Sequence, residues 1–279
     1  MGGTGTGGHR YSLGVQRRRP SPVSDPIGLA LPRSFPARYG TGIRRGLCLG
    51  GGGLFFVAWQ VSYLNALAGR GVRFDDADRV VGTSAGAIVS AAVTTGRLKR
   101  LYSEVSVLSR IPAVVSALAP AGELSPSQNR ALELFLEATD GDALTVQAIG
   151  HAALAAIAPR PEVARRNIAL VVGTGRWPSD ALHITCVDAY SGERCVVTRE
   201  ARTSVARAAA ASSAVPGVFA PQPIADRRCM DGGVSGSGVH LDLVAGAQRV
   251  LVLALTDGSA MTEGMMTIHP DAGRQEAET

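Results

Sequence analysis

One pentapeptide constrains the fold of this chain more than any other segment: Gly82-Thr83-Ser84-Ala85-Gly86. It follows a short apolar segment typical of a buried strand and precedes an apolar segment with helical spacing, which extends to about Thr95. Gly-x-Ser-x-Gly between a strand and a helix is typical of a nucleophile elbow, a turn so tight that only small residues fit beside the serine. Ser84 would lie at the positive end of the helix dipole, which stabilises an oxyanion. A helix N-cap serine without chemistry is the alternative.

A run of four glycines, Gly50–Gly53, joins a second predicted strand, 45–49, to a predicted helix at 57–69. Amides without neighbouring side chains can approach a ligand closely, and the helix dipole adds positive potential. The run can therefore bind a phosphate, bind an oxyanion, or form a purely structural turn. A P-loop requires a terminal Gly-Lys-Ser/Thr, which is missing, and a dinucleotide-binding loop requires a third glycine where this chain has Phe56.

A candidate acid, Asp231, begins the sequence Asp-Gly-Gly directly after a short predicted strand. A carboxylate at a strand end can accept the hydroxyl proton of Ser84, and general-base catalysis is worth about 10²–10⁴-fold in rate. Asp-Gly is also a common turn sequence, so a structural role is the alternative.

Histidine decides between a two-residue and a three-residue mechanism. An α/β-hydrolase triad places its histidine after the acid, and only His240 and His269 follow Asp231. We expect both histidines at the surface and His183 to be structural, and therefore favour a Ser–Asp pair. The conventional triad stays an alternative that substitution of His240 and His269 would test.

The composition indicates a globular domain with a sizeable core, since 46% of the 279 residues are hydrophobic. The net charge of +5 reflects eight arginines against one acid in the first 45 residues, so it indicates no nucleic-acid partner for the folded part. No CxxC pair is present, and we expect no metal and no cofactor. The four cysteines lie in predicted strands and are expected to be buried free thiols: Cys48, Cys186, Cys195 and Cys229.

The chain divides into three predicted regions. Residues 1–42, rich in Arg, Gly and Pro, are expected to be disordered, and 271–279 is a polar tail. Residues 43–270 form the predicted domain, in which the helical segment 98–165 is expected to be a cap-like insert over the site. No apolar run reaches 18 residues and no signal peptide is recognisable, so we expect a cytoplasmic protein with peripheral membrane contact.

The second half of the domain also mixes strands and helices. A hairpin is predicted at 183–188 and 193–198, and a small-residue helix at 205–211. Further strands are predicted at 167–172, as a pair of strands ending at 228–230, at 249–255 and, shorter, at 266–268. This order predicts an α/β fold with a parallel sheet covered by helices.

Five segments in this order resemble the patatin-like phospholipase family: LCLGGGG at 47–53, AWQ at 58–60, VGTSAGA at 81–87, ASSAVPGVF at 211–219 and RRCMDGG at 227–233. The resemblance implies a three-layer α/β fold with a mostly parallel central sheet flanked by helices. It also implies hydrolysis of acyl esters of lipids or phospholipids through an acyl-enzyme intermediate.

The resemblance assigns a role to each motif by its position. Ser84 is the implied nucleophile and Asp231 the implied base, and together they form a catalytic dyad. The implied supporting residues are the oxyanion-hole glycines Gly51, Gly52 and Gly53, the elbow glycines Gly82 and Gly86, and the acid-motif glycines Gly232 and Gly233.

Two departures from the family pattern motivate a second hypothesis. Phe55 and Phe56 stand where many members have a basic residue and then a glycine, and the glycine-rich stretch 234–240 stands where an asparagine is frequent. The alternative is therefore a catalytically weak or inactive patatin-like module that binds lipid or a partner. Phe55, Phe56 and Trp59 have helical spacing and either line an acyl chain or pack in the core.

Overall fold

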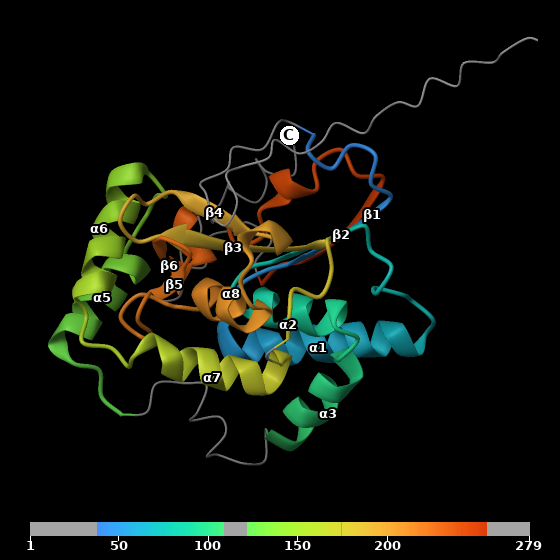
Figure 1. Cartoon of the computed structure of the whole chain (residues 1–279), viewed down its shortest axis with the longest axis horizontal. Coiled ribbons are helices and arrows are strands. Elements are labelled where there is room, and N and C mark those ends of the chain that lie inside the picture. Colours follow the sequence, from blue (N-terminus) through green and yellow to red (C-terminus); the bar gives the residue numbers. More distant parts are fainter. Residues whose placement is uncertain (1–37, 109–121, 174, 256–279) are drawn as a thin grey trace, which may run out of the picture.

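The computed structural model describes residues 38–108, 122–173 and 175–255 (Figure 1). Most of the segment 1–42, the polar tail 271–279, the short strand expected at 266–268 and His269 therefore lie outside the described residues.

The described strands form one mixed sheet of seven strands. The sheet is mostly parallel, which confirms the prediction. Its order is β5-β6-β3-β2-β1-β7, and β4 also pairs with β3. The block β7-β1-β2-β3 is parallel, whereas β4 and β6 run antiparallel to β3 and β5 runs antiparallel to β6. The strands are β1 (Arg45–Leu49), β2 (Arg79–Gly82), β3 (Leu182–Asp188), β4 (Arg194–Val197), β5 (Gln222–Ile224), β6 (Arg227–Asp231) and β7 (Arg249–Leu253).

Helices pack against one face of this sheet and at one end of it (Figure 1). The described part of the chain contains seven α-helices: α1 (Gly53–Gly69), α2 (Ala85–Thr94), α3 (Leu98–Leu108), α5 (Pro126–Leu136), α6 (Ala143–Ala155), α7 (Pro161–Val172) and α8 (Val205–Ser212). Helices α1, α2, α7 and α8 lie below the sheet in Figure 1, whereas α5 and α6 lie at its left end. Among the described helices, none combines the length and the apolar character that crossing a bilayer requires.

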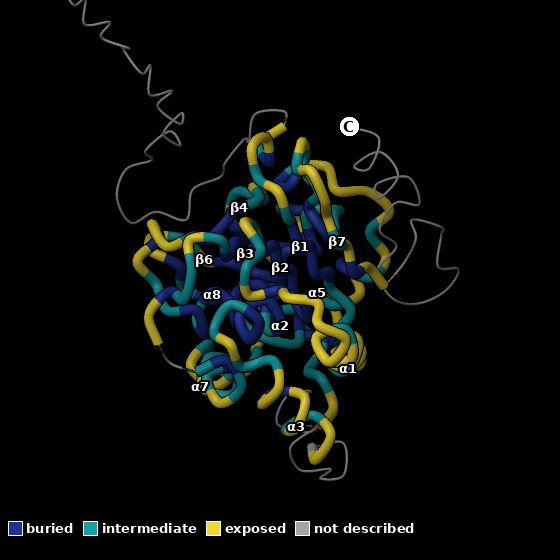
Figure 2. The backbone as a smooth tube through the Cα atoms, turned by 90° about the vertical axis from the view of Figure 1, so that its right-hand side faces the viewer, coloured by how far each residue is buried: buried dark blue, intermediate teal, exposed yellow. Residues whose placement is uncertain are grey.

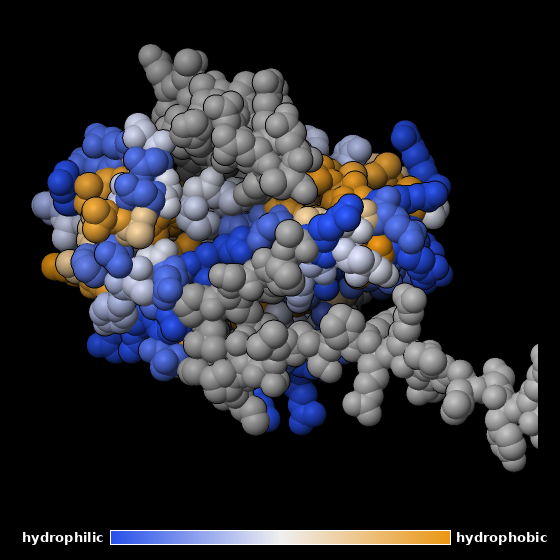
Figure 3. All heavy atoms as spheres, turned by 90° about the horizontal axis from the view of Figure 1, so that it is seen from above, coloured by the Kyte–Doolittle hydropathy of each residue, from blue (hydrophilic) through white to orange (hydrophobic). Residues whose placement is uncertain are grey.

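Burial concentrates in strands β1, β2 and β3 and in helices α2 and α8 (Figure 2). The main core lies between this helical face and the sheet. On the other face, a smaller cluster packs Leu243 and Val244 against Cys48, Val81 and Val196. All four cysteines are buried free thiols in strands, which confirms that prediction. Exposed apolar side chains gather in two separate groups on the face seen from above (Figure 3).

Helix α2 is the centre of the helical face because its side chains are small. It contacts β1, β2 and β3 as well as α1, α7 and α8, and eight of its ten residues are buried. Gly86 lies directly against the backbone of Leu49, so that a Cβ at this position would overlap the Leu49 carbonyl. The second glycine of the pentapeptide therefore allows α2 to approach the carboxyl end of β1.

Two sequence-based expectations about secondary structure are wrong. The strand expected at 167–172 is the end of helix α7, which starts at Pro161 and buries Ile168 and Val172 four residues apart while Leu170 is exposed. Its continuous apolar run resembles a buried strand, but burial follows the helical period. The strand expected to be strongly buried at 249–255 is β7, a shorter edge strand with mostly exposed side chains.

Other local predictions are confirmed. Strands β3 and β4 form the expected antiparallel hairpin, and the small-residue helix expected at 205–211 is α8. Within the segment expected to be helical, α5 starts at a capping box in which Ser125 and Gln128 exchange hydrogen bonds. Helices α3, α5 and α6 occupy much of the segment 98–165. That this segment caps the site stays a prediction.

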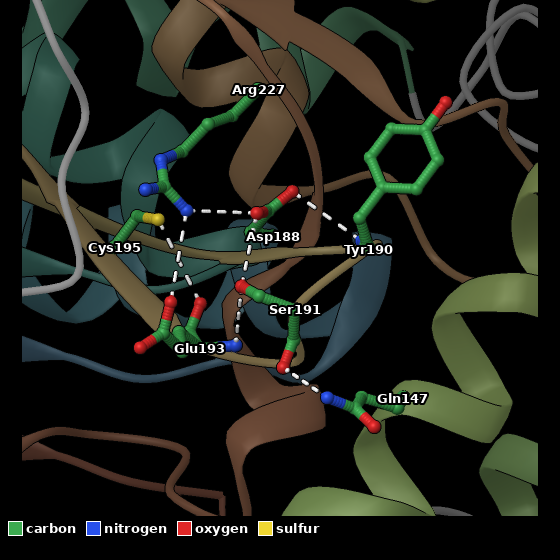
Figure 4. A network of polar contacts seen from close by, with 7 residues as sticks. All are labelled: Gln147, Asp188, Tyr190, Ser191, Glu193, Cys195 and Arg227. Carbon is green, nitrogen blue, oxygen red and sulfur yellow. Dashed lines mark hydrogen bonds and ion pairs between the residues drawn. The ribbon is translucent and has the colours of Figure 1, made fainter.

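A polar network fixes the start of β6 beside the β3–β4 turn (Figure 4). Arg227 Nη1 donates to Asp188 Oδ2 at 2.8 Å, and Ser191 Oγ donates to the same oxygen at 3.0 Å. Gln147 of α6 donates to the Ser191 carbonyl at 2.9 Å. Because Arg227 and Asp188 are both largely buried, removing one partner would leave a desolvated charge. The network thus anchors the strand that ends at Asp231.

The close approach of α2 to β1 predicts a position-specific effect of a single methyl group. We expect Gly86→Ala to destabilise the fold by about 3 kcal/mol, a fall in melting temperature of roughly 6–12 °C for a domain of this size. Gly69→Ala is the matched control, because a Cβ at this end of α1 would meet no atom within 4 Å. Equal melting temperatures for the two variants, measured by circular dichroism, would contradict this packing.

Candidate active site

Ser84 occupies a strained turn between β2 and α2. Its φ of 52° and ψ of −116° are unusual for a residue with a side chain, and such a conformation costs about 1–3 kcal/mol. Ser84 is the N-cap residue of α2, but its side chain makes no capping hydrogen bond. Ser84 thus occupies the N-cap position without using its side chain to cap the helix, and the hydroxyl is left for another role.

The end of helix α8 holds this turn in place. The Ser84 amide donates to Ser212 Oγ at 2.8 Å, and Ser213 Oγ donates to the Ser84 carbonyl at 3.1 Å. The amide and the carbonyl of the strained residue Ser84 are thus both hydrogen-bonded to serines that are adjacent in the sequence. This role of Ser212 and Ser213 could not be predicted from the sequence, because serines at the end of an alanine-rich helix carry no specific signal.

Asp231 lies at the end of β6 and is almost completely buried. Its Oδ1 accepts a hydrogen bond from the Gly233 amide at 2.9 Å, whereas its Oδ2 has no partner of ordinary hydrogen-bond geometry among the described residues. Burial raises the pKa of Asp231 to about 6, against the smaller lowering effects of the Ser84 hydroxyl and the Gly233 amide. One oxygen therefore caps the following turn, and the other is available to Ser84.

Strand β3 and the segment after α8 bring Ser84 and Asp231 together. The Asp231 amide donates to the Ala214 carbonyl at 3.0 Å, directly after the two serines that hold Ser84. On β3, Thr185 Oγ1 lies 2.8 Å from Thr83 Oγ1, and a Cβ at Gly232 would lie 2.6 Å from that same Thr185 oxygen. The residue before the serine and the residue after the aspartate thus pack on one threonine, a role that sequence reasoning missed.

The glycine run lies against Ser84. A Cβ at Gly51 would lie 3.3 Å from the Ser84 Cβ, and Gly52 and Gly53 have positive φ values of 151° and 65°. The Gly51 amide donates to the Gly238 carbonyl at 3.2 Å, whereas the amides of Gly52 and Gly53 have no acceptor within the described ranges. Of the three glycines expected to bind an oxyanion, Gly51 therefore has its amide already occupied, which leaves Gly52 and Gly53.

The structure corrects the expected position of one histidine. His240, expected at the surface, is fully buried with a φ of 54°. Its Nδ1 lies 3.2 Å from Arg194 Nη1 and must be the acceptor, because a guanidinium only donates. Burial and the Arg194 charge lower the pKa of His240 to about 3. The His240 ring is buried beside the salt bridge between Arg194 and Asp242. The spacing of these residues in the sequence does not reveal that they meet.

No histidine in the described part of the chain hydrogen-bonds to Ser84 or Asp231. His183 is buried in β3, as expected for a structural residue, and His269 lies outside the described residues. Within the described residues there is likewise no group of three His, Cys, Asp or Glu side chains that could hold a metal ion.

The buried carboxyl predicts a pH-dependent cost to stability. Since the folded pKa of Asp231, about 6, exceeds the ordinary value of 3.8, stability present below pH 4 is lost as the pH rises through about 6. Asp231→Asn should therefore be more stable than the wild type by about 2–3 kcal/mol at pH 7.5 and equal to it near pH 4. Urea unfolding at both pH values measures this.

Asp226→Asn, in the exposed turn before β6, controls for the loss of any one carboxylate. An Asp231→Asn variant that is less stable than the wild type at pH 7.5 would mean that the carboxylate is compensated by a partner.

Comparison with known proteins identifies the family to which this chain belongs. Among solved structures, the crystal structure of VipD from Legionella pneumophila matches with a TM-score of 0.45 and 15% sequence identity. The match covers 75% of this chain and 49% of that chain, so this chain spans about half the length of VipD.

No curated protein matches the sequence significantly. The family model for patatin-like phospholipase matches residues 47–243. This range is more than half of the chain, and the chain therefore belongs to the patatin-like phospholipase family.

Proposed function

We propose that this chain is a serine lipid acyl hydrolase in which Ser84 is the nucleophile and Asp231 the general base. Family membership supports hydrolysis of a lipid acyl ester. The observation that carries the finer assignment is the buried Asp231 carboxyl: its Oδ2 has no partner of ordinary hydrogen-bond geometry among the described residues, and the nearby Ser84 hydroxyl lowers its pKa against the effect of burial.

Acylation begins when Asp231 takes the proton of Ser84 Oγ as that oxygen attacks the ester carbonyl carbon. The carbonyl oxygen becomes an oxyanion, which the amides of Gly52 and Gly53 receive at the positive end of α1. The carbon–oxygen bond to the leaving alcohol then breaks, and Asp231 returns the proton to that alcohol. The products of this half-reaction are the deacylated lipid and an ester between the fatty acyl group and Ser84.

Deacylation repeats these steps with water. Asp231 takes a proton from water as its oxygen attacks the acyl-enzyme carbonyl, and the same two amides hold the second oxyanion. Collapse releases the fatty acid, and Ser84 Oγ regains the proton from Asp231. A base with a pKa of about 6 suits this cycle, because it is ionised at neutral pH and yet binds a proton more strongly than an ordinary aspartate.

Replacing Ser84 by Ala tests the proposal. We expect hydrolysis of p-nitrophenyl butyrate to fall at least about 10³-fold, because the covalent intermediate cannot form. Ser103→Ala, which removes an exposed serine of α3, is the matched control and should retain wild-type activity. A fluorophosphonate probe should label the wild type at Ser84 and leave the Ser84→Ala variant unlabelled, as read by mass spectrometry.

The same experiment separates the enzyme from the alternative of an inactive binding module. Wild-type protein that is folded but neither hydrolyses the ester nor reacts with the probe would support the binding module. Undiminished hydrolysis by Ser84→Ala would contradict the assignment of the nucleophile.

A further inference from the structure

Helix α1 exposes an aromatic stripe that the proposed chemistry does not use. Phe55, Trp59 and Tyr63 follow one another at intervals of four residues, so they share one face of the helix, and they are 72%, 42% and 40% exposed. The Trp59 and Tyr63 rings stack with their centroids 5.2 Å apart, and Phe56 stacks on the other side of Trp59 at 5.4 Å. Two of the three exposed rings, Trp59 and Tyr63, therefore stack on each other, and the buried Phe56 packs against Trp59.

The composition of α1 is unusual for a surface helix. A helix on the surface of a soluble domain normally carries charged residues on its outer face, but all seventeen residues of α1 are uncharged. Exposed apolar residues also occur elsewhere, for example Leu144 of α6 and Leu170 of α7, so exposure alone does not distinguish α1. What distinguishes α1 is that it has no charged residue and that two of its exposed aromatic side chains stack on each other.

The stripe starts beside the candidate site. Helix α1 begins at Gly53, whose amide is one of the two proposed oxyanion donors, and Leu54 and Phe55 follow in the first turn. Leu54 is 37% exposed and extends the apolar surface toward the glycine run. A surface that contacts Leu54 and Phe55 is therefore brought within one helical turn of the residues that lie against Ser84.

Two exposed cations lie at the end of α1 and on the helix that packs against it. Arg70 directly follows α1, and Lys99 lies in the first turn of α3, which packs against α1; both side chains are exposed. Aromatic side chains prefer the interface between the bilayer and water, and a neighbouring Lys or Arg adds attraction to anionic headgroups. Exposed aromatic rings on a helix with one cation at its end and another on the neighbouring helix fit the surface of an anionic bilayer.

We propose that the exposed face of α1, formed by Leu54, Phe55, Trp59 and Tyr63, is the surface by which the protein adsorbs to an anionic phospholipid bilayer. This inference rests on the proposed function, since it explains how a lipid in a membrane reaches Ser84. Adsorption through this face places the glycine run and the elbow at the lipid surface, so that an acyl ester need leave the bilayer by only a short distance.

Vesicle binding by matched variants tests this surface. We expect the wild-type full chain to sediment with phosphatidylglycerol vesicles and Phe55→Ser to bind them at least about tenfold more weakly. Leu144→Ser is the matched control, because Leu144 is 77% exposed in the first turn of α6, and it should bind as the wild type does. Equal melting temperatures of the three proteins show that the folds are comparable.

Trp59 supplies a second readout at the surface itself. The chain has two tryptophans, and Trp177 is buried, so in a Trp177→Phe variant the fluorescence reports on Trp59 alone. Its emission should shift to shorter wavelength when phosphatidylglycerol vesicles are added. This readout is needed because the eight arginines among the first 45 residues can themselves attract anionic vesicles.

Two results would overturn the inference: Phe55→Ser binding as tightly as the wild type, or an unshifted Trp59 emission on vesicles that do bind the protein. Hydrolysis of a water-soluble ester by the wild type is measured in parallel. Failure of that hydrolysis contradicts the proposed function, whereas hydrolysis without adsorption through α1 contradicts only the surface proposed here.

Discussion

The site depends on one short segment, Ser212–Ala214, that hydrogen-bonds to both of its halves. Ser212 and Ser213 hold the amide and the carbonyl of Ser84, and the Ala214 carbonyl holds the amide of Asp231. Ser84 follows β2 and Asp231 ends β6, two strands that flank β3 and are far apart in the sequence. Because both strand ends are bound to the same three residues, their separation is set by the local backbone rather than by the long connections between them.

Two unfavourable features are concentrated at this point, and the surrounding structure compensates for both. The Ser84 backbone is strained, and the Asp231 carboxyl is buried with one oxygen left without an ordinary partner among the described residues. The core around α2 and the polar network at the start of β6 keep the two strands in place despite these costs. The desolvation that destabilises ionised Asp231 also raises its affinity for a proton, which is the property that a base acting without histidine requires.

The sequence was sufficient for those parts of the fold and site that depend on local motifs. Small residues with specific backbone requirements mark the glycine run, the elbow and the acid turn. A Cβ at Gly86 would overlap the Leu49 carbonyl and one at Gly52 would overlap Phe56, which explains why glycine is needed at both positions. Features that depend on packing between distant segments could not be predicted. The burial of His240 depends on Arg194 and Asp242, and the occupied Gly51 amide depends on Gly238. The second half of α7, residues 167–172, is predicted as a strand because its apolar run is continuous, whereas its burial follows the helical period.

The central claim is that Asp231 alone activates Ser84, and the pH dependence of probe labelling tests it most directly. The second-order rate constant for reaction of Ser84 with a fluorophosphonate should rise with pH through about 6 and then level off, as Asp231 ionises. In Asp231→Asn the reaction should be slow, and this rise should disappear. A rise of the same size that persists in Asp231→Asn would assign the base to another group and contradict the account.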